Sequence, residues 1–98
     1  MPFRIYTTPE ADDNLDHLAK DKGLEKRLKA VRKALRLLET DPRHPGLNSH
    51  KYSSLKGRHV EDVFESYAES DTPAAYRIFW HYGPGKDIIT VFFITPHP

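Results

Sequence analysis

The chain has 98 residues, of which 38% are hydrophobic, 30% charged and 11% aromatic, and none is cysteine. These proportions are typical of one compact globular domain and exclude a disordered or fibrous protein. Without cysteine there are no disulfides or thiolate metal sites. The sequence also has no apolar run of about 18 residues, the length needed to span a membrane. The N-terminal residues have no apolar signal core, so we expect a cytoplasmic protein with a single domain over residues 1–98.

The net charge of +1 hides an uneven distribution of charge along the chain. Residues 1–19 hold one cation and four acids, residues 20–60 twelve cations and four acids, and residues 61–98 two cations and six acids. A positive middle segment in a nearly neutral protein favours a face that attracts a polyanion or an acidic partner. The same cations also suit the solvated side of a long helix, and the sequence leaves both interpretations open.

The first half of the chain is predicted to be one strand followed by two helices. Residues 3–7 alternate and contain β-forming residues, which predicts a short strand. Thr8 precedes proline and can cap a helix that starts there, and Gly23 is the expected stop. A second helix is predicted over about 24–40, where leucine or valine recurs every three or four residues, and Pro42 follows its end. The two helices should form an antiparallel hairpin over one face of a sheet.

The second half of the chain is predicted to be a long loop followed by three strands. Residues 42–59 are rich in proline, glycine, serine and asparagine and carry several cations beside Tyr52. This mixture suits phosphates and stacked bases, although an ordinary solvated loop is the alternative. Strands are predicted at about 60–68, 75–82 and 87–95, with turn residues between them. The expected fold class is α+β, in the order β-α-α-β-β-β, with helices on one sheet face and the other face open.

Arg77 and His81 are the polar members of the predicted strand 75–82, which is otherwise apolar. Because side chains alternate along a strand, Arg77 and His81 share one face, and Trp80 lies with apolar neighbours on the other. We expect the apolar face to pack under the helices. Arg77 and His81 are then left on the open face, where a rigid strand would hold them in a fixed geometry.

Pairing of the predicted strands brings further candidates to this open face. If the hairpin turns near residue 72, Glu65 and Tyr67 lie beside the strand of Arg77, and His97 arrives from the last strand. Such a cluster suits RNA cleavage by the 2′-hydroxyl, which needs a base, an acid and a cation that stabilises the phosphorane. No metal-binding or cofactor motif is present, and none is needed for this chemistry. An ordinary cross-strand ion pair of Arg77 with Glu65, and an idle tail histidine, are the alternatives.

Taken together, these features resemble the RelE/ParE family of toxins from prokaryotic toxin–antitoxin pairs. The resemblance covers essentially the whole chain, and its motifs are FRIYTTPEA at 3–11, LKG at 55–57, FES at 64–66, YRIFW at 76–80 and ITPHP at 94–98. It implies a curved, mostly antiparallel sheet and an antitoxin partner. It also implies either ribosome-dependent mRNA cleavage or, as in the ParE branch, gyrase inhibition. A degenerate relative that only binds an antitoxin is the third alternative.

The resemblance also implies roles for individual residues. Arg77 matches the strand arginine that contacts the scissile phosphate, and His97 resembles the C-terminal histidine or tyrosine that acts as an acid or base. Glu65 matches a glutamate of some branches whose role is catalytic or structural. Lys51, Lys56 and Arg58 lie where the family places basic residues that bind RNA. We also expect Tyr67 and His81 to bind RNA because they share the open face, and the resemblance assigns a role to neither. The leading hypothesis is a metal-independent mRNA endoribonuclease that acts on the ribosome and is neutralised by its antitoxin.

Overall fold

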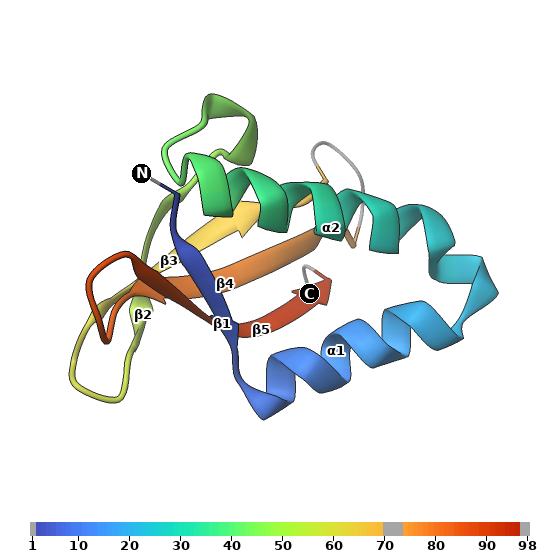
Figure 1. Ribbon diagram of the computed structural model, residues 1–98. Coiled ribbons are helices and arrows are strands. Elements are labelled where there is room, and N and C mark those ends of the chain that lie inside the picture. Colours follow the sequence, from blue (N-terminus) through green and yellow to red (C-terminus); the bar gives the residue numbers. More distant parts are fainter. Residues whose placement is uncertain (1, 70–73, 97–98) are drawn as a thin grey trace.

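The computed structural model of the protein describes residues 2–69 and 74–96, in which two helices cover one face of a five-stranded sheet (Figure 1). The elements are β1 (Arg4–Thr7), α1 (Pro9–Lys20), α2 (Glu25–Thr40), β2 (His50–Lys56), β3 (Asp62–Tyr67), β4 (Tyr76–Tyr82) and β5 (Ile88–Pro96), with single 3-10 turns at Lys22–Leu24 and Pro45–Leu47. The predicted α+β class with a helix pair on one side of a mostly antiparallel sheet is confirmed. In the described part of the chain, no helix is long and apolar enough to cross a membrane.

The strands lie in the order β1-β5-β4-β3-β2, and only the pair of β1 and β5 is parallel. Residues 70–73, where the turn before β4 was predicted, are outside the described residues. The register on either side of them is nevertheless the predicted one, because Glu65 lies opposite Phe79 and Tyr67 lies opposite Arg77.

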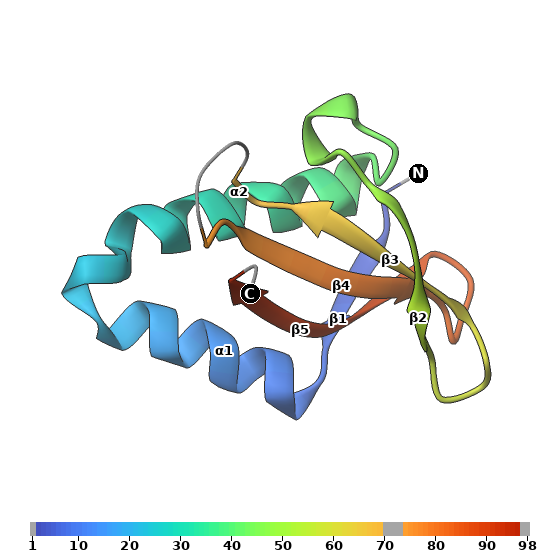
Figure 2. The same cartoon turned by 180° about the vertical axis from the view of Figure 1, so that it is seen from behind.

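The prediction of an uninterrupted loop over residues 42–59 is wrong. This segment contains β2, which pairs with β3 at the edge of the sheet (Figure 2). Only Tyr52 and Leu55 of β2 are partly buried, and the pairing register shifts between Lys51 and Lys56. Lysines and irregular pairing are common in edge strands, since both discourage further strand addition. They also remove the regular alternation by which a strand is recognised in the sequence. With β2 included, the antiparallel part of the sheet has four strands, whereas three were predicted.

The helix ends follow local hydrogen bonds. Thr8 caps α1 as predicted, and its hydroxyl also donates to the carbonyl oxygen of Phe92 at 2.6 Å, which ties the helix start to β5. The helix ends at Lys20, before the predicted stop at Gly23. Asp21 ends it by adopting an extended backbone, and its carboxylate accepts the N–H of Gly23 at 2.8 Å in the following turn.

The core lies between the helices and the sheet, and Trp80 is its largest fully buried side chain. Trp80 is 1% exposed and lies on the helix-facing side of β4 with Ile78 and Tyr76, as predicted. Its indole Nε1 donates to the hydroxyl of Ser66 at 2.7 Å, and the hydroxyl of Ser49 lies 2.5 Å from the same oxygen. The core therefore contacts the start of β2 through a chain of hydrogen bonds that begins at the indole.

Replacing Trp80 by alanine should lower the free energy of unfolding by about 3–5 kcal/mol, because a large cavity forms and a buried hydroxyl loses its donor. Tyr6→Ala is the control, since Tyr6 is 58% exposed and its removal should change stability by only about 0.5 kcal/mol. Urea unfolding followed by far-UV circular dichroism measures both. Equal stability of the two variants would contradict the assigned face of β4.

Candidate functional site

Glu65 is a carboxylate with only 2% of its surface exposed, at the centre of a polar cluster. Its Oε2 accepts a hydrogen bond from Nη1 of Arg77, and its Oε1 lies 2.6 Å from Nε2 of His50. A carboxylate in the protein interior is costly unless it is paired and hydrogen-bonded. Both oxygens of Glu65 are engaged in this way, so the carboxylate links β4 to β2 through β3.

Three neighbouring strands position this cluster. His50 on β2 lies opposite Glu65 on β3, while Arg77 on β4 is diagonal to Glu65, two residues from its direct partner. Residues two apart along a strand share a face, so all three side chains meet on the side away from the helices. Tyr67 lies opposite Arg77, and the guanidinium carbon is 5.3 Å from the centre of its ring, within the range of a cation–π contact.

Arg77 and His81 are buried, whereas we expected their side chains to be exposed on the open face of the sheet. Arg77 is 7% exposed because Glu65 and Tyr67 cover it. His81 is 4% exposed, and its ring packs against Phe92 with the ring centres 4.8 Å apart. Alternation along the strand predicted the correct face for both residues, but it does not report which neighbouring side chains cover that face.

His81 does not join the cluster around Glu65. It lies four residues from Arg77 along β4, a distance of about 13 Å for an extended strand. Its Nδ1 is 2.7 Å from the carbonyl oxygen of Tyr82, which can only accept, so Nδ1 carries the hydrogen of this bond. The structure therefore divides the predicted site into two parts along the same face.

His50 takes part in the cluster but was not among the predicted site residues. Sequence reasoning placed it in a loop, where no spacing rule connects it to Glu65. The half-exposed imidazole, with 49% of the side chain accessible, becomes a candidate only when β2 is recognised as the antiparallel partner of β3. No periodic signal in the sequence could have found it, because Tyr52 and Leu55, the partly buried residues of β2, are three positions apart and do not alternate.

The predicted catalytic residue His97 lies outside the described residues. The end of β5, which precedes His97 in the chain, pairs with the beginning of β4, and Thr95 lies opposite Arg77. The described end of β5 thus lies beside Arg77 in the sheet, and the role of His97 stays a prediction.

The three cations expected to bind RNA lie on β2 and on the turn that follows it. Nζ of Lys56 is 2.7 Å and Nζ of Lys51 is 3.3 Å from the carboxylate of Asp62. Hydrogen bonds from Lys56 first, and then from Lys51, hold the pKa of Asp62 below its usual range. Part of the lysine charge is therefore neutralised by this carboxylate, whereas Arg58 is exposed in the turn.

Beside Arg77 the same face has a shallow aromatic groove of about 330 Å³. The ring of Phe79 contacts Tyr52 on one side and Phe93 on the other, with ring centres 5.0 and 4.8 Å apart. Thr95, which faces Arg77 across the strands, also lines the groove. Aromatic rings next to a guanidinium suit unpaired bases and their phosphates.

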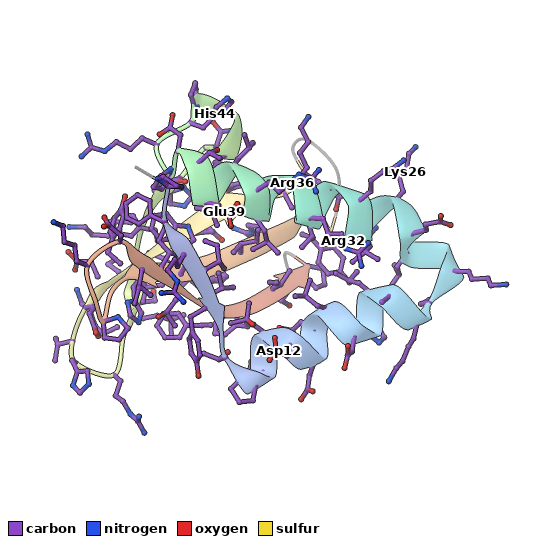
Figure 3. All side chains as sticks on the ribbon, viewed as in Figure 1. Asp12, Lys26, Arg32, Arg36, Glu39 and His44 are labelled. Atoms are coloured by element: carbon purple, nitrogen blue, oxygen red, sulfur yellow. The ribbon has the colours of Figure 1, made fainter. Side chains whose placement is uncertain are left out.

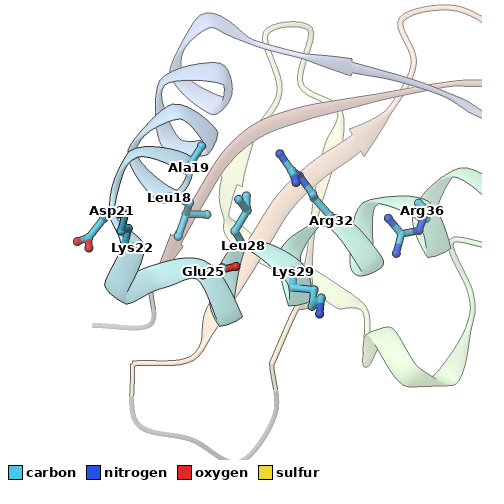
Figure 4. A pocket seen from close by; sticks show the side chains of 9 residues that line it. All are labelled: Leu18, Ala19, Asp21, Lys22, Glu25, Leu28, Lys29, Arg32 and Arg36. Carbon is cyan, nitrogen blue, oxygen red and sulfur yellow. The ribbon is translucent and has the colours of Figure 1, made fainter.

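A second groove, of about 540 Å³, lies between α1 and α2 (Figure 4). Leu18 and Leu28 form its apolar part, and cations of α2 such as Arg32 and Arg36 line it along the helix, as the view in Figure 3 also shows. Within the described residues neither arginine has an ion-pair partner. These are cations of the positive middle segment, so that segment is split between this helix surface and the cations of β2.

Comparison with protein-family models finds no match, and comparison with curated protein sequences finds none either. Solved structures do resemble the chain. The YoeB/ParE toxin of Agrobacterium tumefaciens has a TM-score of 0.70 at 10% identity, with 98% of this chain and 100% of that chain covered. RelE of Pyrococcus horikoshii OT3, solved with RelB, has 0.65 at 15%, covering 98% and 96%. YoeB of Staphylococcus aureus, a dimer, has 0.64 at 14%, covering all of both chains.

The chain therefore has the fold of the RelE, YoeB and ParE toxins. This confirms, for the fold, the resemblance inferred from the sequence motifs. At these identities the likeness carries no residue roles, which have to be argued from the site itself.

Removing the Glu65 side chain by Glu65→Ala should lower the free energy of unfolding by about 3–5 kcal/mol, because Arg77 then stays buried without its partner. Asp62→Ala is the matched control on the same strand, and it should leave stability close to that of the unmodified protein because its ion pairs are exposed. Urea denaturation of the two variants gives the comparison. A Glu65→Ala protein as stable as its control would show that the cluster contributes nothing to the fold.

Proposed function

We propose that this protein is the toxin of a toxin–antitoxin pair and that it cleaves mRNA on the ribosome without a metal ion. The observation that carries the proposal is a guanidinium held by a buried carboxylate, beside a half-exposed imidazole and an aromatic groove. The likeness in fold to proteins named as toxins supports the biological class, and this cluster supports the reaction. The activity would be exerted in the cytoplasm, where mRNA is translated.

In the proposed reaction, a base removes the proton of a 2′-hydroxyl, whose oxygen then attacks the adjacent phosphorus. The bond to the 5′ oxygen breaks, and an acid protonates that leaving oxygen. The products are a 2′,3′-cyclic phosphate and a 5′-hydroxyl, so no water or cofactor is consumed. Charge accumulates on the phosphate oxygens in the transition state, which is where a fixed cation has its largest effect.

Arg77 supplies this cation. One of its five N–H donors is used by Glu65, and a guanidinium keeps its charge at any physiological pH. Within the described residues, Nε and Nη2 of Arg77 donate to no other group, and 9% of the side chain is exposed. They are available to phosphate oxygens at the edge of the groove.

Proton transfer is assigned to His50 through Nδ1, which makes only a long contact of 3.3 Å to the carbonyl oxygen of Asn48, and to His97 on the strength of the family resemblance. Glu65 was predicted to be catalytic, but each of its oxygens already faces another side chain. We therefore assign it the role of positioning Arg77 and His50. An imidazole changes charge near neutral pH, so it can serve as either base or acid.

The antitoxin is proposed to place an acidic, amphipathic segment in the groove between α1 and α2. Its apolar side chains would cover Ala19 and Leu28, and its carboxylates would pair with Arg32 and Arg36. RNA is less suited to this groove, whose lining has no aromatic ring on which a base could stack. The ribosome and its mRNA are instead assigned to the opposite face of the sheet.

Arg77→Lys should slow cleavage by about 100–1000-fold, because lysine keeps the charge but loses the fork that matches phosphate oxygens. His50→Gln should slow it by about 100–10,000-fold, since glutamine can still donate to Glu65 but does not exchange a proton. Single-turnover cleavage of mRNA on programmed ribosomes measures both rates. Circular dichroism of each variant serves as the control for folding.

Folded variants that cleave as fast as the unmodified protein would remove these residues from the mechanism. An unmodified protein that never cleaves on translating ribosomes, but inhibits DNA supercoiling by gyrase, would favour the ParE-like alternative. Absence of both activities, with binding to an antitoxin retained, would favour a degenerate relative.

Asp62→Asn should strengthen binding to single-stranded RNA, because Lys51 and Lys56 no longer have a carboxylate partner and become free for phosphates. Each additional phosphate contact should steepen the plot of log affinity against log salt by about 0.7. Fluorescence anisotropy at several salt concentrations tests this. Asp13→Asn on α1 changes the net charge equally at an exposed site and should alter the slope much less. Identical slopes for the two variants would contradict a local role of the lysines.

A further inference from the structure

A β-bulge in β5 places two consecutive phenylalanines on the face away from the helices. Phe93 pairs with Phe79, but the next pair joins Trp80 to Val91, so Phe92 is the extra residue. In a regular strand one of the two phenylalanines would point into the core under the helices. The bulge instead turns both toward the open face, and bulges are common where a side chain is re-aimed beside a functional site. The aromatic surface therefore continues past the groove at Phe79.

Beyond Phe92 lies a hollow of about 660 Å³ that the proposed reaction does not use. It is bounded by β1, the start of α1 and the turn between β2 and β3. Tyr6 is 58% exposed on its β1 side, and Phe92 and Ile88 form its apolar floor. The turn contributes polar side chains of both kinds of charge, namely Arg58, His59 and Glu61.

The polar wall of the hollow is held in place by the turn itself. A side chain at Gly57 would collide with the Glu61 carboxylate and would lie 3.1 Å from the ring of His81, so only glycine allows this close approach. The N–H of His59 donates to the carboxylate of Glu61 at 2.8 Å. Backbone N–H groups of Glu61 itself and of His59 hold the pKa of this carboxyl below its usual range, so it is an ionised acceptor at neutral pH.

The hollow lies on the path that a bound RNA strand would follow. From Arg77 to His81, whose ring packs on Phe92, β4 covers about 13 Å, several times the base step of about 3.4 Å. The rings of Phe79 and Phe93 occupy the distance between the two ends. A strand with its reacting phosphate at Arg77 can therefore run over these rings and reach the hollow with a later base.

We propose that this hollow binds an unpaired base of the RNA, several nucleotides from the cleaved bond, and so contributes to the choice of cleavage site. The base stacks on Tyr6 and Phe92, Glu61 accepts hydrogen bonds from N–H groups on its edge, and Arg58 contacts the adjoining phosphate. This proposal rests on the proposed function, because it assumes that the open face binds RNA. An aromatic floor with one fixed acceptor and nearby cations fits a nucleotide better than an apolar peptide.

The test is binding of a mixed-sequence ten-nucleotide 2′-O-methyl RNA, which cannot react because its 2′ oxygens are blocked. Affinity is measured by NMR titration, which detects binding even when the dissociation constant is in the millimolar range. Tyr6→Ala should weaken binding by about 5- to 150-fold, the range for loss of one stacked base. Tyr82→Ala is the control, since Tyr82 is 40% exposed but points to the helix side of β4. It should bind the RNA as the unmodified protein does.

Unchanged binding by Tyr6→Ala, or equal weakening by both variants, would overturn the proposal while leaving the cleavage function intact. Failure of the unmodified protein to bind the RNA at all would also overturn the proposal, and cleavage on programmed ribosomes tests the proposed function separately. Glu61→Gln adds a second readout, because it keeps the size of the side chain but replaces a carboxylate, which only accepts hydrogen bonds, with an amide that also donates. If Glu61 reads the base, differences in affinity among oligonucleotides that vary at this position should shrink in Glu61→Gln. Differences that persist unchanged would remove Glu61 from recognition.

Discussion

The carboxylate of Glu65 is shared between the guanidinium of Arg77 and the imidazole of His50, and the arrangement of the open face depends on this contact. A buried carboxylate with one partner would leave half of its hydrogen-bonding capacity unmet. With two partners it fixes the distance between a permanent cation and a titratable group. It also joins the edge strand β2 to the centre of the sheet, in addition to the backbone pairing.

The two faces of the sheet support each other through neighbouring residues. Ser66 follows Glu65 on β3, and Ser49 precedes His50 at the start of β2. The indole of Trp80 donates to Ser66, whose hydroxyl is bonded to Ser49, on the core side of the same strands. Packing under the helices thus sets the position of β2, and β2 in turn sets the position of the imidazole. A catalytic geometry on a rigid sheet is expected to rely on such supporting contacts.

The elements that could be predicted from the sequence have strong local or periodic signals. Thr8 and the leucine repeat of α2 predicted the helices, and alternation around Trp80 predicted the faces of β4. β2 was missed because its exposed edge and irregular register leave no periodic pattern. That omission also concealed His50, since its proximity to Glu65 arises only from strand pairing. The burial of Arg77 was missed for a related reason, because it depends on side chains from a neighbouring strand.

The chemistry of the RNA ends tests the central claim most directly. An mRNA translated in the presence of the protein can be recovered and its cleaved ends identified by mass spectrometry. The account predicts a 2′,3′-cyclic phosphate and a 5′-hydroxyl, and no cleavage when the reacting nucleotide is 2′-deoxy. Ends that carry a 5′-phosphate, or cleavage that persists at the 2′-deoxy position, would contradict attack by the 2′-hydroxyl at the cluster of Glu65, Arg77 and His50.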